Sequence, residues 1–248
     1  MADNNIREYR VWDVPTRLFH WINFLAVIGL IVIGLLMMYK KELGITGVPA
    51  KVGLKELHVT IGYVFAVNLL VRLLWGFVGN PFARWRSILP GPGFGAVLRS
   101  YWATVKAGEP QTWLGHNPLG RLAVTAMLLV MLTLAGSGLI RAGTDVYYPP
   151  FGDMVEDYVA ADGTDPDSLR PYDPSGTDAA RMAELKAFKG PFGEVHQYAA
   201  FLLMALLLIH ILFVVLAEIQ EGGGLVLAMI NGRKRVSDRP VDEPGNVP

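Results

Sequence analysis

The sequence contains no cysteine among its 248 residues. This absence excludes disulfide bonds, thiolate zinc sites, iron–sulfur clusters and covalently attached c-type haem. The formal net charge is zero, so overall charge does not indicate a nucleic-acid partner. The chain also lacks a recognisable pairing of nucleophile and base for hydrolytic or group-transfer chemistry. What remains to interpret is a large apolar fraction and a handful of histidines.

The N-terminal segment does not resemble a cleavable secretory signal. The first 21 residues, MADNNIREYRVWDVPTRLFHW, are polar, carry Asp3 and Glu8, and contain no small-residue cleavage site. We therefore expect the first apolar segment to remain in the mature protein as an anchor.

Apolar residues dominate the chain. They make up 52% of the sequence, and the mean hydropathy of +0.35 exceeds that of a usual soluble domain. Segments long enough to span a bilayer cover residues 18–39, 59–78, 119–140 and 195–219. One such segment can be a buried core helix, but four in so short a chain cannot. The prediction is an all-α integral membrane protein, a four-helix transmembrane bundle forming a single domain over residues 1–248.

Lysine and arginine predict the orientation. The N-terminus, the second loop and the tail carry 12 of the 22 basic residues, and this excess predicts that both termini are cytoplasmic. The second loop also contains apolar residues at helical spacing over 94–105, which indicates a helix on the cytoplasmic membrane surface. The tail segment LVLAMINGRKR suits the same interface.

The third loop, residues 141–194, is acidic. It holds 11 of the 22 acidic residues against five basic ones, a net charge of −6. It is either a solvated periplasmic loop without function or a docking surface for a basic electron carrier, with Asp162, Asp165 and Asp167 as candidates. Within it, DAARMAELKAF predicts a short surface helix.

Four of the five histidines lie in or beside the apolar segments. His196 and His210 are fourteen residues apart, so on a helix they share a face and are separated by about 21 Å. With the N-terminus inside, His58 matches the outer level of His196, and His20 matches the inner level of His210. A polar ring in lipid needs a partner, and each pair can ligate one b-type haem. Depth alone does not show that the helices are adjacent.

Other interpretations of the histidines remain open. A lone histidine at a helix end is commonly a capping or interfacial residue. Zinc or copper would require ligands at one level, whereas these are split between two. A transporter or proton channel could use the histidines as a proton relay, and a scaffold could simply anchor a peripheral enzyme.

Three further residues are candidates for a haem or quinone site. Arg72 lies fourteen residues after His58 and would pair with a propionate of the inner haem, unless it snorkels to the interface or binds a lipid phosphate. Arg17, one turn before His20, is a similar candidate. His116 has no partner at its depth; it is a surface histidine by default, with a quinone site as the alternative.

The chain resembles the b-type cytochrome subunits of nickel–iron hydrogenases and the bacterial cytochromes b561. The matching stretches are VWDVPTRLFHWINFLAVIGLIVIGLLM, HVTIGYVFAVNLLVRLLWGFVG, GHNPLGRLAVTAMLLVMLTLAGSGL, and GEVHQYAAFLLMALLLIHILFVVL with the tail AMINGRKR. They cover every predicted span and most of the inner loops. The resemblance implies a four-helix bundle with two non-covalent b haems, and it places His20, His58, His196 and His210 at ligand positions. The long third loop departs from it.

The resulting prediction is transmembrane electron transfer by a di-haem b-type cytochrome, with quinone as substrate. The other partner would be a periplasmic electron-transfer protein or a dehydrogenase or hydrogenase subunit, or the chain would be a stand-alone quinone oxidoreductase. The resemblance implies a multi-pass protein of the bacterial inner membrane. A transporter, proton channel or membrane anchor remains the alternative.

Overall fold

The computed structural model describes residues 6–220 and 224–243. These residues group into two compact units, and each long helix contributes to both. The first unit comprises Met1–Trp21, Leu69–Leu129 and Met204–Pro248, as far as they are described. The second unit comprises Ile22–Asn68 and Val130–Leu203. Whether the whole chain is a single domain stays a prediction.

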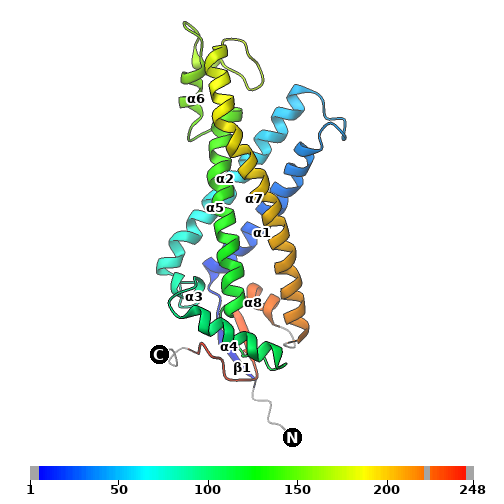
Figure 1. Cartoon of the computed structure of the whole chain (residues 1–248), viewed down its shortest axis with the longest axis vertical. Coiled ribbons are helices and arrows are strands. Elements are labelled where there is room, and N and C mark those ends of the chain that lie inside the picture. The colour runs from blue at the N-terminus through cyan, green and yellow to red at the C-terminus, as the bar shows by residue number, and fades with distance from the viewer. Residues whose placement is uncertain (1–5, 221–223, 244–248) are drawn as a thin grey trace. The chain divides into compact units, whose positions relative to one another are not determined.

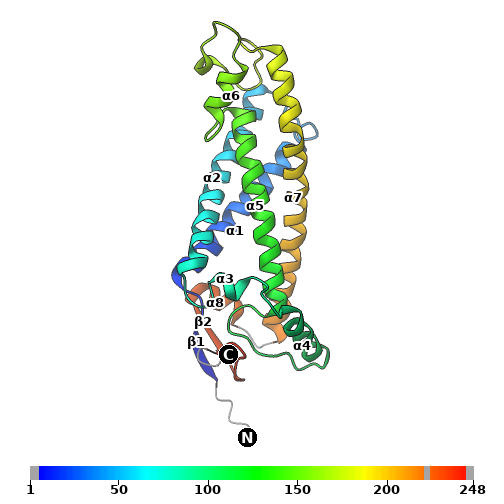
Figure 2. The same cartoon turned by 60° about the vertical axis from the view of Figure 1, so that its left-hand side comes forward.

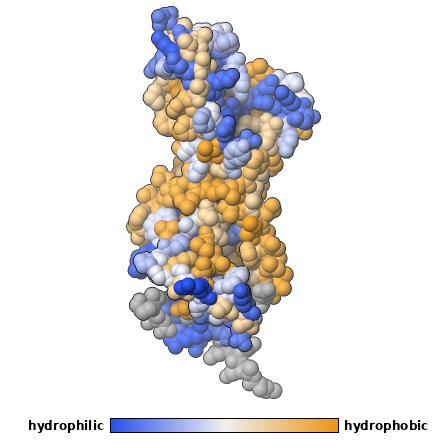
Figure 3. Space-filling model, in the orientation of Figure 1, coloured by the Kyte–Doolittle hydropathy of each residue, from blue (hydrophilic) through white to orange (hydrophobic). Residues whose placement is uncertain are grey.

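Long apolar helices form the framework of the chain (Figure 1). Among the described residues, four helices are long and apolar enough to cross a membrane: α1 (Val14–Met38), α2 (Val48–Val78), α5 (Pro118–Val146) and α7 (Ala179–Gln220). At most 28% of the most apolar window of each helix is buried. Apolar residues therefore cover the exposed sides of these helices (Figure 3), as expected where lipid replaces a protein neighbour.

The predicted spans are confirmed as helices, but several bounds differ. α2 begins at Val48 and α7 at Ala179, well before the apolar segments that were predicted from residues 59 and 195. The spans were predicted from runs of apolar residues. Such runs mark only the lipid-exposed part of a helix, so its polar ends are not included in the prediction. The helix predicted in DAARMAELKAF is present from Ala179 onward, but it is not a short helix of the loop, because these residues form the first turns of α7.

The first unit contains short elements near both ends of the chain (Figure 2). Strand β1 (Arg7–Arg10) pairs antiparallel with β2 (Arg233–Val236), and α8 (Leu225–Asn231) precedes β2. The strands were not predicted. They are an exception to the predicted all-helical fold. The carboxylate of Glu8 on β1 forms ion pairs with Arg233 and Arg235 on β2 and so links the two strands.

The second loop also folds within the first unit. It contains α3 (Trp85–Ile88) and α4 (Phe94–Lys106), and α4 confirms the helix predicted over 94–105. Phe82 and Leu114 pack in a small core together with Val11, which follows β1, and Val236 of β2. Asp242 accepts hydrogen bonds from the backbone N–H groups of Leu114 and Gly115, which ties the tail to this loop.

The acidic loop is folded and belongs to the second unit. It contains α6 (Gly152–Val159) and the 3₁₀-helix η1 (Pro166–Ser168), with Ala160 bridging to Thr177. Its small apolar core consists of Val155, Val159, Ala160, Leu169 and Leu185, the last contributed by α7. Tyr63 of α2 donates a hydrogen bond to the carbonyl of Pro149, so the loop is held against a long helix.

Candidate functional site

His58 of α2 and His196 of α7 face each other in the second unit. Their ring centroids are 6.2 Å apart and their planes cross at 70°. An imidazole nitrogen binds a transition metal at about 2.0 Å, so a metal between two rings places the centroids about 6 Å apart. The structure thus brings together two histidines that lie far apart in the sequence, at a separation that admits one metal atom.

Ser137 of α5 orients the His196 ring. Its Oγ lies 2.9 Å from Nδ1 of His196 and 2.6 Å from the carbonyl oxygen of Thr133. A hydroxyl has a single proton to donate. If Ser137 donates it to Thr133, the hydroxyl accepts a hydrogen bond from Nδ1–H of His196. This assignment leaves Nε2 without a proton, as a metal ligand requires, and matches the outer hydrogen bond found on most metal-binding histidines.

Glycines lie against both rings of this pair. A Cβ on Gly34 of α1 would be 3.7 Å from Cε1 of His58, and one on Gly138 of α5 would be 3.3 Å from Cε1 of His196. Their small size keeps side chains away from the rings. Nδ1 of His58 is buried, with no hydrogen-bond partner in the described part of the chain. These features fit a flat, iron-centred group held between the imidazoles.

His20 of α1 and His210 of α7 both lie in the first unit. The His20 ring also makes an edge contact with Trp21, at a centroid distance of 5.3 Å. Within residues 6–220 and 224–243, Nδ1 of His20 is buried without a hydrogen-bond partner. The predicted inner pair is therefore found in one compact unit, as is the outer pair in the other.

Arg72 is a buried cation with an unused donor. Its residue is 5% exposed, and its guanidinium lies over the rings of Phe19 and Trp85, 5.9 and 5.5 Å from their centroids. Nη2 donates to the carbonyl of Ala83 at 3.1 Å, whereas buried Nη1 has no partner among the described residues. Arg17 donates from Nη1 to the carbonyl of Ile230, and its buried Nε is likewise unpartnered there. Both groups have capacity left for an anion.

His116, predicted by default to be a surface histidine, is half-buried. Its Nδ1 is buried and has no hydrogen-bond partner in the described residues, and its ring lies 5.0 Å from that of Trp12. Burial lowers the pKa of His116 to about 4, and the positive charges of Arg72, Arg121 and Lys234 act in the same direction. The imidazole is therefore neutral at physiological pH.

The docking candidates Asp162, Asp165 and Asp167 are all exposed on the folded acidic loop. Asp165 caps η1 by accepting a hydrogen bond from the backbone N–H of Asp167. Asp162 lies 3.7 Å from Arg181, a weak surface ion pair. Their negative charges remain available to solvent.

Sequence reasoning missed a buried carboxylate near the His58 and His196 pair. Asp145 of α5 binds Lys55, Arg141 and Lys189, and its side chain is 6% exposed. The i,i+4 spacing of Arg141 and Asp145 was the available signal. The other two partners come from α2 and α7, so only the folded chain identifies them.

Apolar spanning helices, facing histidines and buried cations with free donors define a multi-pass membrane protein suited to a haem-like group. The family model described as prokaryotic cytochrome b561 matches residues 11–232, and the chain belongs to this family. It is therefore a membrane-bound b-type cytochrome, a protein that uses haem b in electron transport. The resemblance inferred from the sequence is confirmed.

Curated relatives carry hydrogenase names. The chain is 28% identical over 166 residues to the "Probable Ni/Fe-hydrogenase 1 B-type cytochrome subunit" of Escherichia coli (strain K12), covering 62% of this chain and 70% of the relative. It is 24% identical over 246 residues to the "Probable Ni/Fe-hydrogenase B-type cytochrome subunit" of Rhizobium leguminosarum bv. viciae, covering 92% and 90%. No solved structure matches the chain.

Proposed function

We propose that the chain holds two b haems and transfers electrons across the bacterial inner membrane between a periplasmic redox partner and quinone. His58 and His196 ligate the outer haem, and His20 and His210 ligate the inner one. The observation that carries this proposal is the facing pair of His58 and His196, with ring centroids 6.2 Å apart. Bound haem supplies one-electron chemistry, while the chain supplies ligation, burial and spacing.

Several side chains of this protein are positioned to bind or orient the groups at the two proposed haem sites. Ser137 fixes the His196 tautomer so that Nε2 is the ligand. At the inner site, Arg72 and Arg17 offer unpaired N–H donors to the propionates of the inner haem. The neutral His116 can donate to or accept from a quinone oxygen, and its position in the same unit as His20 and His210 supports a quinone site there. The separation of about 21 Å between the two levels remains a prediction from helix geometry.

The strand pairing supports the proposed topology. β1 and β2 belong to opposite ends of the chain and form one antiparallel ladder. Hydrogen-bonded partners lie on the same side of a membrane, so both termini share a side, and the excess of lysine and arginine makes that side cytoplasmic. The acidic loop then faces the periplasm.

A hydrogenase is the partner that the names of the relatives favour. Both described relatives are called probable Ni/Fe-hydrogenase b-type cytochrome subunits. We propose that this chain exchanges electrons with a hydrogenase subunit or with another periplasmic electron-transfer protein. The folded acidic loop, with Asp162, Asp165 and Asp167, is the proposed contact.

Haem stoichiometry tests the proposal. Four histidines paired as proposed can hold two irons, so pyridine haemochrome analysis of the purified full chain should give about two b haems per polypeptide. The haem should be extractable with acidic solvent, since the chain has no cysteine to retain it covalently. A ratio near one, or a protein without reducible α and Soret bands, would contradict the di-haem assignment.

Salt dependence tests the docking loop. Replacing Asp162, Asp165 and Asp167 together by asparagine should slow association with a basic soluble partner severalfold at low salt, because long-range attraction is lost. Asparagine can still cap η1. The difference should shrink as ionic strength rises, since the Debye length is about 10 Å at 0.1 M. Stopped-flow kinetics across a salt series measure this.

The control is Asp238→Asn, an exposed carboxylate in the tail. Equal rates for the triple variant and this control at every salt concentration would mean that the loop is only solvated. Haem content and spectra should be the same in all three proteins.

A further inference from the structure

A cluster of ion pairs surrounds Asp145 in the second unit. Oδ2 of Asp145 lies 2.6 Å from Nη2 of Arg141 and 3.1 Å from Nζ of Lys55, and Oδ1 lies 2.8 Å from Nζ of Lys189. Lys189 also donates to the carbonyl of Thr144 at 3.0 Å. Three helices, α2, α5 and α7, thus place cations on one carboxylate.

The cluster has an uncompensated positive charge. Asp145 supplies one negative charge against the positive charges of Lys55, Arg141 and Lys189, so this group of described residues carries a net charge of +2. The three cationic side chains are between 21% and 35% exposed. Partly buried like charges repel one another unless an anion compensates them. This surplus indicates an anion that Asp145 does not provide.

The cations lie beside the facing histidines. Lys55 is one turn before His58 on α2, and Arg141 is one turn after Ser137 on α5. Arg141 also packs against α7 one turn before His196, because a Cβ on Gly193 would clash with its Nη1. It acts electrostatically on both His58 and His196. The surplus charge is therefore adjacent to the proposed ligands of the outer haem.

We infer that Lys55, Arg141 and Lys189 form the site for the two propionates of the haem held by His58 and His196. This inference rests on the proposed function. Two ionised propionates carry a charge of −2, which would neutralise the cluster. Arg141 can bind a carboxylate through paired N–H donors, while the lysines act as point charges. Asp145 then positions the cations rather than binding the haem.

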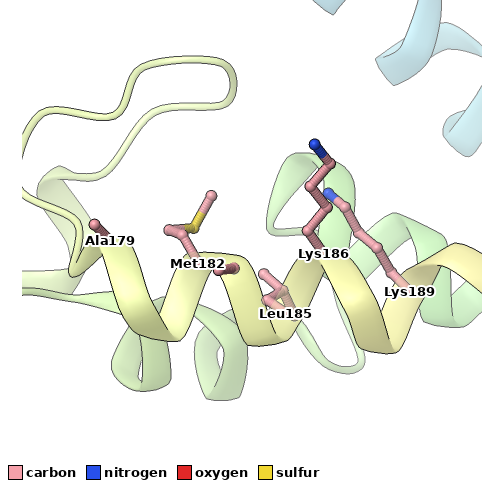
Figure 4. Close-up of a pocket in the computed structure, with 6 residues that line it drawn as sticks. Ala179, Met182, Leu185, Lys186 and Lys189 are labelled. Carbon is pink, nitrogen blue, oxygen red and sulfur yellow. The ribbon is translucent and has the colours of Figure 1, made fainter.

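Lys186 provides a matched control on the same helix. It lies one turn before Lys189 on α7 (Figure 4), and both line a shallow pocket together with Met182 and Leu185. Lys186 is exposed and makes no ion pair within the described part of the chain, whereas Lys189 reaches Asp145. A change at Lys186 therefore removes an equal charge from the same region without touching the cluster.

The test compares haem with haem dimethyl ester, in which both propionates are uncharged. The full chain carrying His20→Ala is used, so that only the His58 and His196 site is filled, and the apoprotein is offered mixtures of the two porphyrins. Protohaem should be preferred. Arg141→Gln and Lys189→Met should each reduce that preference about tenfold, as expected for one charged hydrogen bond, while Lys186→Met should leave it unchanged.

Redox titration of the otherwise unaltered full chain gives a second readout. Arg141→Gln should lower the midpoint potential of the outer haem and leave the inner haem unchanged, because removing a positive charge favours the ferric form. If the chain holds two haems but Arg141→Gln and Lys189→Met behave like Lys186→Met in both measurements, the inference is overturned and the proposed function stands. If the unaltered chain holds fewer than two haems, the proposed function itself fails.

Discussion

Replacing His58 by alanine is expected to leave a folded protein with one b haem instead of two. His58 and His196 face each other in one compact unit, whereas His20 and His210 lie in the other. Loss of one of the two imidazoles would remove the proposed iron site of that pair but would not touch the second pair. Pyridine haemochrome analysis measures the haem content, and low-temperature spectra of the reduced protein show which α band is lost.

The pairing itself is tested by combining variants. His196→Ala should remove the same haem as His58→Ala, and the double variant should resemble each single one. His58→Ala combined with His210→Ala should instead remove both haems. Gln197→Ala, beside His196 on α7, is the control and should keep both. Separate spectral losses from His58→Ala and His196→Ala would show that these residues belong to different sites, and the pairing would be wrong.

The long helices could be predicted because lipid imposes a simple requirement. A helix that crosses the bilayer exposes apolar side chains for about 20 residues, and four such runs are visible without any structure. The proximity of His58 to His196 was also accessible, since orientation and spacing set depth. Sequence could match His58 to His196 by level only, and the structure supplies the facing rings.

The remaining features depend on contacts between distant segments. Strands β1 and β2 are rich in arginine. Their pairing depends on contacts between distant segments, such as the ion pair between Glu8 and Arg233. Asp145 is unremarkable in the sequence, yet α2 and α7 bring Lys55 and Lys189 to it. Polar helix ends such as the start of α7 resemble loops when apolar runs are the criterion. Long-range polar contacts leave no local pattern to read.

Arg72→Gln is expected to lower the midpoint potential of the inner haem. The guanidinium is buried, and its Nη1 has no partner among the described residues, so a propionate would complete its hydrogen bonds. Glutamine can still donate to the carbonyl of Ala83, which Arg72 holds at 3.1 Å. The variant thus removes the charge while keeping that backbone contact.

The size of the shift follows from simple electrostatics. A unit charge about 10 Å from the iron, at an effective dielectric constant of about 20, contributes roughly 1.7 kcal/mol, which for a one-electron couple corresponds to a fall of about 70 mV. Spectroelectrochemical titration resolves the two haems if their α bands differ. Arg72→Lys should recover most of the potential, because it restores the charge.

The control is Arg86→Gln, which removes an exposed charge from the same unit. Solvent screens that charge, so the potential should move little. A change confined to the midpoint potential of the outer haem would contradict the placement of Arg72 beside the inner haem. An equal shift from Arg72→Gln and Arg86→Gln would mean that net charge, and not contact with a propionate, sets the potential. A shift confined to the inner haem and recovered by lysine is the result that places the buried guanidinium beside the haem of His20 and His210.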